Sequence, residues 1–271
     1  MSEFLHIFMN VVIPILSGMV YFALARYVKH IGPMRTLVTG KLTYDGAYWG
    51  FLILGAYLAT RPLQILLGPH PMPLIINNIR EFVMMGFFSP AVTVAMMSLV
   101  LGSNNIPKIL VRVLFGFGLV AASIFVVVNT KAIGGSEMIF MLGDLSAYDG
   151  IWFKAGSTSP LMPILFIIRL INPVLLVFSA GFLVLWHAFN YPTEKKMLYD
   201  NMPKKLYLMG FACVAFSLSM LSVGLLYLFA DIPNQWWIYY VGALTAGLLE
   251  TVSLSLPLRR AVKITEHAKT K

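Results

Sequence analysis

The sequence predicts an all-α polytopic integral membrane protein, a bundle of seven transmembrane helices with the N-terminus outside and the C-terminus in the cytoplasm. Composition, the spacing of the apolar segments and the placement of the basic residues support this prediction. Hydrophobic residues make up 59% of the 271 residues and charged residues 11%, with a mean hydropathy of +0.81. A soluble domain carries about 25% charged residues. The composition therefore excludes an ordinary globular enzyme, a disordered chain and a fibrous repeat.

A helix needs about 20 mostly apolar residues to cross the hydrocarbon core of a bilayer. Seven stretches of the sequence meet this requirement: 5–27, 46–67, 82–102, 108–128, 161–188, 206–230 and 236–257. The segments between these stretches are too short for a separate soluble domain. We therefore expect a single membrane domain over residues 1–271, with outer loops at 68–81 and 129–160 and a basic cytoplasmic tail at 258–271.

The basic residues set the expected orientation, because Lys and Arg concentrate on the cytoplasmic side of membrane proteins. Of the 20 Lys and Arg residues, fifteen flank span ends that share one side, the side of the C-terminal tail, and five lie on the other side. The net charge of +9 is thus accounted for by membrane topology. The basic residues form no stripe interleaved with aromatics, so we predict the lipid bilayer and not a nucleic acid as the partner of this chain.

The first outer segment contains Pro69, Pro71 and Pro73 within five positions. Proline at this density prevents a regular helix, so a bent segment that follows the membrane interface or partly re-enters the membrane is expected there. Arg80 and Glu81 are expected to cap this segment near the start of the third span.

The second outer segment, residues 129–160, mixes glycines, acidic residues and aromatics. It is expected to fold as a lid on the helix ends, either as a simple structural cap or as a place for ligand contact. The spacing of its acidic residues matches no calcium-binding EF-hand loop, so no metal site is predicted. The expected ligand or partner surface comprises Glu137, Asp144, Asp149, Trp152, Arg80 and Glu81.

Ionisable residues inside a membrane cost roughly 2.5–3.5 kcal/mol each at the helix centre and are functional candidates. Small and polar residues at helical spacing mark the packed faces of several spans, among them Ser17 and Gly18 in span one and Arg112, Gly116 and Ser123 in span four. The predicted buried network of charged and polar side chains comprises Glu250, Arg112, Arg169, Asn10 and Asn172.

Within this network, Arg112 is the expected partner of Glu250, with Arg169 second, because Arg112 enters span four from the side nearer to Glu250. Such a pair would tie span seven to span four. Two interpretations of Glu250 stay open: a structural carboxyl, paired or protonated and hydrogen-bonded, and a residue that relays protons or coordinates an ion.

The sequence has no nucleophile–base pattern, paired catalytic carboxylates, phosphate-binding loop or zinc-binding helix motif. Its histidines offer no pair at matched depth for haem. We therefore predict no catalytic residues, no cofactor and no enzymatic activity.

Three classes of function fit these observations. The favoured one is a receptor-like or sensory module that relays a signal to a separate protein, in the membrane or at the basic cytoplasmic face. The second is a structural or accessory subunit of a larger membrane complex. The third is a small-solute transporter with parallel three-helix repeats, suggested by the similar proline spacing in 14–33 and 173–192. The bacterial inner membrane is the expected location.

Overall fold

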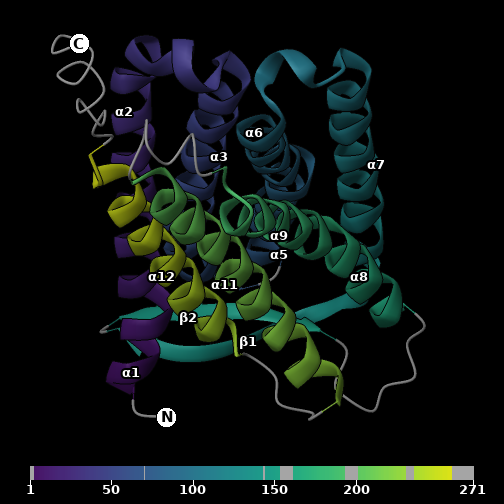
Figure 1. Cartoon of the computed structure of the whole chain (residues 1–271). Coiled ribbons are helices and arrows are strands. Elements are labelled where there is room, and N and C mark those ends of the chain that lie inside the picture. The colour runs from purple at the N-terminus through teal and green to yellow at the C-terminus, as the bar shows by residue number, and fades with distance from the viewer. Residues whose placement is uncertain are drawn as a thin grey trace, which may run out of the picture.

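A computed structural model describes residues 3–69, 71–142, 144–152, 161–192, 201–229 and 235–257 (Figure 1). It is helical except for one pair of strands. The elements are, in chain order, α1 (Glu3–Ile7), η1 (Phe8–Val12), α2 (Ile13–Thr39), α3 (Lys41–Ala59), α4 (Arg61–Leu66), α5 (Met72–Val83), η2 (Met84–Phe88), α6 (Ser89–Leu101), η3 (Ser103–Asn105), α7 (Lys108–Ala132), β1 (Ile133–Leu142), β2 (Leu145–Trp152), α8 (Leu161–Arg169), η4 (Leu170–Leu175), α9 (Leu176–Phe189), α11 (Met202–Phe229) and α12 (Trp236–Ser255).

The described part of the chain contains six helices that are long and apolar enough to cross a membrane. They are Phe4–His30, Met72–Leu101, Lys108–Ala132, Pro163–Phe189, Met202–Leu226 and Trp236–Ser255. This arrangement is that of a helical polytopic membrane protein, as the composition predicts.

The second predicted span, 46–67, is divided in the structure. Helix α3 ends at Ala59, and the short helix α4 begins at Arg61 after Thr60. Helix α3 is long but begins with polar residues such as Thr43 and Asp45, which lower its mean hydropathy. Six helices therefore meet both the length and the hydropathy condition in the described residues, and the seventh span stays a prediction.

Six helices form a closed ring. Helix α2 packs on α3, α3 on α6, α6 on α9, α9 on α11, α11 on α12, and α12 on α2. Helix α7 lies outside this ring and packs on α5, η2 and α8. Small residues permit the close contact of α2 with α3, because a Cβ atom on Gly18 would lie only 2.9 Å from the Cβ of Ala59. The predicted packed face of span one is thereby confirmed at Gly18.

The predicted packed face of span four is wrong. Arg112 and Ser123 are exposed on α7, and a Cβ atom on Gly116 would meet nothing within 4 Å. The buried face of α7 carries Ala122 and Phe125 instead, which pack under α5 and α8. In lipid, exposed surface is apolar by default, so one small-residue stripe does not reveal which side of a peripheral helix is packed.

The expectation that prolines exclude a regular helix at 68–81 is also wrong over most of that segment, because Met72–Val83 is the helix α5. Pro71 precedes this helix and Pro73 lies in its first turn. Proline is tolerated at these positions, since the first backbone N–H groups of a helix have no intrahelical partner. Helix α5 then continues through η2 into α6 as one long segment.

The all-α prediction misses a β-hairpin. Strands β1 and β2 pair antiparallel, with Glu137 opposite Asp149, and lie across one end of the bundle beside α1 (Figure 1). Phe140 and Ala147 are buried against Ile65 of α4. We call this end of the bundle the hairpin end. The hairpin is a folded cover on the helix ends, as predicted for the segment 129–160, of which residues 153–160 lie outside the described part of the chain.

Candidate functional site: a buried polar cluster at the hairpin end

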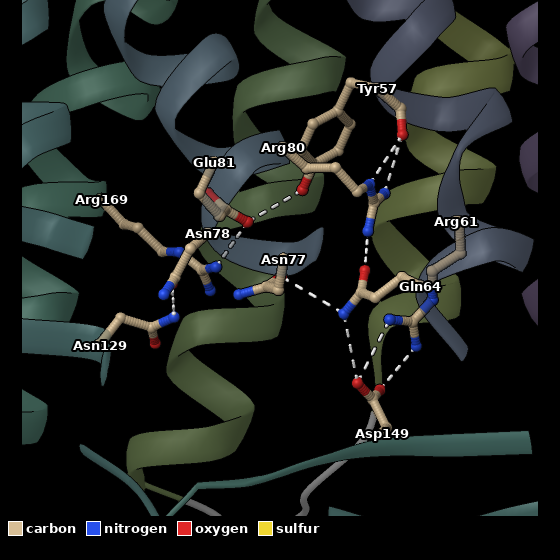
Figure 2. Close-up of polar contacts among 10 residues, drawn as sticks. All are labelled: Tyr57, Arg61, Gln64, Asn77, Asn78, Arg80, Glu81, Asn129, Asp149 and Arg169. Carbon is tan, nitrogen blue, oxygen red and sulfur yellow. Dashed lines mark hydrogen bonds and ion pairs between the residues drawn. The ribbon is translucent and has the colours of Figure 1, made fainter. Parts of the chain in front are cut away.

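A group of polar and charged side chains lies between the hairpin and the helix ends (Figure 2). We call it the hairpin-end cluster and define it as Tyr57, Arg61, Gln64, Asn77, Arg80, Glu81, Asp149 and Arg169. All of them are buried except Arg169, whose side chain is 17% exposed. The cluster draws on α3, α4, α5, α8 and β2, so its side chains come from distant parts of the chain.

Helical periodicity explains how α5 contributes three members. Asn77, Arg80 and Glu81 are spaced three and four residues apart, so they share one face of the helix. That face is buried, whereas Ile75 and Ile79 on the other side are 47% and 60% exposed. Helix α5 is thus amphipathic with its polar face turned inward, as expected where the outer face meets lipid.

Arg61 and Asp149 form the ion pair that ties the hairpin to α4. The guanidinium donates from Nη2 to Oδ2 at 2.6 Å and from Nη1 to Oδ1 at 3.3 Å, and the two side chains are 3% and 6% exposed. Nη2 also lies 3.5 Å from Oδ1 of Asn10. A two-point contact of this kind fixes the geometry of both partners, and burial makes each dependent on the other.

Arg80 closes the end of α3. Its Nε and Nη2 atoms donate to the carbonyl of Tyr57 at 3.1 and 2.8 Å, and its guanidinium carbon lies 4.3 Å from the centre of the Tyr57 ring. Its Nη1 atom donates to Oε1 of Gln64. The last carbonyls of a helix lack intrahelical partners, and a cation there also meets the negative end of the helix dipole.

Gln64 connects Arg80 to the hairpin. Its Nε2 atom lies 3.4 Å from Oδ1 of Asn77 and 3.5 Å from Oδ1 of Asp149. One amide therefore contacts α5 and β2 at the same time, and the Gln64 side chain links Asp149 of the hairpin to Arg80.

Glu81 joins α5 to α3 and α8. Its Oε1 atom accepts hydrogen bonds from the Tyr57 hydroxyl at 3.0 Å and from Nη2 of Arg169 at 2.7 Å. The guanidinium carbon of Arg169 lies 4.9 Å from the ring centre of Phe125 and 4.8 Å from that of Trp236. Cation–π contacts of this kind hold the arginine over aromatic faces while it neutralises the carboxylate.

The cluster surrounds a small cavity in which two donors are unused. The cavity has a volume of about 10 Å³. The residues that line it are Tyr57, Arg61, Gln64, Pro73, Asn77, Arg80, Glu81, Asp149, Trp236 and Tyr240. Nε of Arg61 and Nδ2 of Asn77 are buried without a hydrogen-bond partner. Three arginines meet two carboxylates within the cluster, so its charge and its unused donors both favour a ligand that accepts hydrogen bonds.

The structure brings some of the predicted surface residues together and separates others. Asp149, Arg80 and Glu81 are buried in one cluster, in which Arg80 and Glu81 bind Tyr57 of α3 instead of capping the segment 68–81. Asp144 is exposed on the turn of the hairpin. The side chains of Glu137 and Trp152, on β1 and β2, lie outside the described part of the structure.

The predicted buried network does not form. Glu250 is buried and Arg112 is exposed, and no ion pair joins them in the described structure. The reason is helix placement, because α12 packs on α2 and α11 whereas α7 packs on the other side of the bundle. Arg169, the second expected partner of Glu250, binds Glu81 instead.

The two asparagines of the predicted network have separate roles. Asn10 is buried beside Arg61, and its Nδ2 atom donates to the carbonyl of His6 at 3.0 Å. Asn172 is fully buried where η4 departs from helical geometry, and its Nδ2 atom donates to the carbonyl of Met85 at 3.1 Å. Asn10 therefore borders the hairpin-end cluster, and Asn172 joins two interrupted helices.

Four cluster members, Tyr57, Arg61, Gln64 and Asn77, were not predicted from the sequence. The usable signal was the spacing of the polar residues, since Arg61 and Gln64 are three apart and Asn77, Arg80 and Glu81 repeat the same helical face. The described residues contain no group of three or more His, Cys, Asp or Glu side chains placed to hold a metal ion.

Comparison with known proteins adds no relative: no family model, no curated protein and no solved structure matches this chain.

Proposed function

We propose that this chain is a receptor-like membrane protein that binds a small anionic ligand at the hairpin-end cluster and relays binding to a separate protein. The cavity of about 10 Å³ has room for about one non-hydrogen atom, so one oxygen of the ligand enters it while the rest of the ligand takes the place of the Asp149 carboxylate. The supporting observation is the pair of buried donors without partners, Nε of Arg61 and Nδ2 of Asn77, on the wall of a cavity under the hairpin. A buried donor that lacks a hydrogen-bond partner lowers the stability of the folded protein. An acceptor atom of a bound ligand would remove this cost.

The same contacts suggest how binding is transmitted. A carboxylate or phosphate oxygen beside Arg61 would compete with Asp149 for the guanidinium, and the hairpin would loosen. Gln64 contacts Asp149, Asn77 and Arg80, so this change would reach the end of α3 and the long segment from α5 to α6. Helix α6 ends at the opposite end of the bundle (Figure 1), where a partner would contact it.

A thermal-unfolding experiment in mild detergent tests the ligand site. Sodium acetate and sodium phosphate are compared with sodium chloride at equal ionic strength. We expect one of the two oxyanions to raise the unfolding midpoint of the unmodified protein and of Asn190→Ala, an exposed control at the opposite end. Asn77→Ala should abolish the rise. Equal midpoints in all three salts would contradict the proposed site for these anions.

We further propose seven spans with the hairpin end outside, counting α3 as the additional span. Fifteen of the 20 Lys and Arg residues support this orientation. Cysteines introduced at Leu145, in the hairpin, and at Lys41, at the opposite end, report it in a Cys213→Ala background. A membrane-impermeant maleimide applied to intact cells should label position 145 and spare position 41. The opposite pattern would reverse the orientation.

An accessory subunit of a membrane complex is the second candidate, supported by α7. This helix leaves Arg112, Gly116 and Ser123 on its exposed side, and small or polar residues in membranes commonly pack against another helix. Purification from native membranes in mild detergent separates the two candidates. A stable complex of fixed stoichiometry, lost in Gly116→Leu, would favour the accessory subunit over a receptor that acts alone.

A further inference from the structure

A second cavity lies on the axis of the six-helix ring, with no lining residue in common with the hairpin-end cavity. Every helix of the ring contributes to its wall: Tyr21 from α2, Phe51 from α3, Val92 from α6, Val177 from α9, Cys213 from α11 and Ala246 from α12. The cavity has a volume of about 40 Å³. This volume has room for roughly three to four non-hydrogen atoms.

Aromatic rings form much of this wall. Tyr21 and Phe51 lie with ring centres 6.0 Å apart, and Phe88 and Phe216 with ring centres 5.4 Å apart. The Tyr21 hydroxyl donates to the carbonyl of Ala243 at 2.9 Å, so this polar atom is already satisfied. The faces of such rings carry partial negative charge and attract cations.

Glu250 supplies the one carboxylate among the lining residues. It is 4% exposed, and its Oε2 atom has no hydrogen-bond partner. Lys205 of α11 lies beside the next turn of α12, where its ammonium donates to the carbonyls of Ser253 at 2.8 Å and Leu254 at 3.3 Å. A buried carboxyl in an apolar pocket is costly unless a counter-charge or a hydrogen bond compensates it.

We infer that the central cavity is a binding site for a small organic ammonium ion, with Glu250 as the counter-ion. The aromatic rings of Tyr21, Phe51, Phe88 and Phe216 surround the alkyl groups of the ion, and Oε2 of Glu250 accepts its N–H. A divalent metal ion does not fit, because calcium and magnesium require six or more oxygen ligands and this wall offers few. The inference is independent of the proposed anion site.

The probe for this site is trimethylammonium chloride, whose four non-hydrogen atoms match the cavity. The unfolding midpoint of the detergent-solubilised protein is measured against equal concentrations of sodium chloride and of tert-butyl alcohol, a neutral molecule of similar shape. We expect a saturable rise of several degrees with trimethylammonium alone. Asp45→Asn, which removes an exposed carboxylate of α3, should keep the rise, and Glu250→Gln should abolish it.

A cavity-filling variant makes the test independent of how Glu250→Gln folds. Ala246→Val adds two methyl groups to the cavity wall while Glu250 stays in place, and it should reduce the rise at least fivefold at the same concentration. Retention of the full rise in either folded variant would overturn the inference. So would an equal rise with tert-butyl alcohol, which would identify a plain apolar cavity, or no rise with trimethylammonium in the unmodified protein.

Discussion

Two buried glutamates have opposite surroundings in this protein. Glu81, 3% exposed, accepts hydrogen bonds from Arg169 and from the Tyr57 hydroxyl. Glu250, 4% exposed, faces an apolar cavity, and its Oε2 atom has no partner. Burial is thus the same, and the neighbours differ. The depth of a carboxylate in a helix therefore does not define its role, because the compensating group comes from other elements.

The difference follows from the elements around each residue. Glu81 receives its hydrogen bonds from Tyr57, near the end of α3 (Lys41–Ala59), and from Arg169, the last residue of α8. Glu250 lies within the ring, where the neighbouring helices are continuous and their backbone groups are already paired. Groups that can pair with a buried charge are available at helix ends and are scarce along helix sides.

The largest loss of stability is expected at the hairpin end, where the buried charges are paired. Arg61→Ala leaves Asp149 buried without its partner, and breaking a buried ion pair by removing one member costs roughly 3–5 kcal/mol of unfolding free energy. Denaturant unfolding in detergent measures this loss. The double variant with Asp149→Ala should recover part of the stability, since it removes the stranded charge. Additive losses would mean that the two side chains are not coupled.

A smaller loss is expected for Arg169→Met, about 1.5–3 kcal/mol, the usual contribution of a hydrogen bond to a charged group. The Tyr57 hydroxyl still binds Glu81 in this variant, and Arg169 is partly exposed, so the loss should be less than for Arg61→Ala. Addition of Glu81→Gln should restore some stability. A loss equal to that of Arg61→Ala would contradict the ranking of the two ion pairs.

Glu250→Leu is expected to raise the unfolding free energy by about 1 kcal/mol or more, because an apolar side chain replaces an uncompensated carboxyl. The Arg112–Glu250 pair predicted from the sequence would instead make this substitution destabilising. Glu81→Leu is the matched comparison and should be destabilising, because it strands Arg169. If both leucine variants lose stability equally, Glu250 has a compensating partner after all.

The smallest effect is expected for Arg112→Gln, within about 0.5 kcal/mol, as for most exposed substitutions. This variant sharpens the comparison of the two glutamates. A double-mutant cycle with Glu250→Gln should give no coupling energy. A coupling above 0.5–1 kcal/mol would restore the predicted contact between span four and span seven.

Prediction from sequence succeeded where a property depends on local composition. The helical membrane architecture and the folded cover formed by β1 and β2 followed from apolar segment length and loop composition. Prediction failed at α5, where prolines at a helix start were read as helix breakers, and at the break after Ala59. Both errors concern helix ends, where a few residues with context-dependent roles set the boundary.

The prediction of the candidate site likewise succeeded for properties of the local sequence and failed for contacts between distant segments. Asp149 was selected from the sequence as an acidic residue of the outer segment 129–160, and Arg80 and Glu81 as caps of the segment 68–81, although their burial was not foreseen. Arg61 was counted only as a topology signal, yet it is the partner of Asp149 across 88 residues of sequence. No pattern within either segment indicates that α4 and β2 meet.

The sequence by itself determined that this chain is a helical membrane protein, because the transfer of apolar segments into lipid is a sum of local terms. The tertiary structure decided which buried charges meet. Pairing requires both side chains to face the same point in space, which depends on the rotation of each helix and on the helix beside it. Helix rotation and the identity of the neighbouring helix place Arg169 beside Glu81, whereas they place Glu250 at the wall of a cavity.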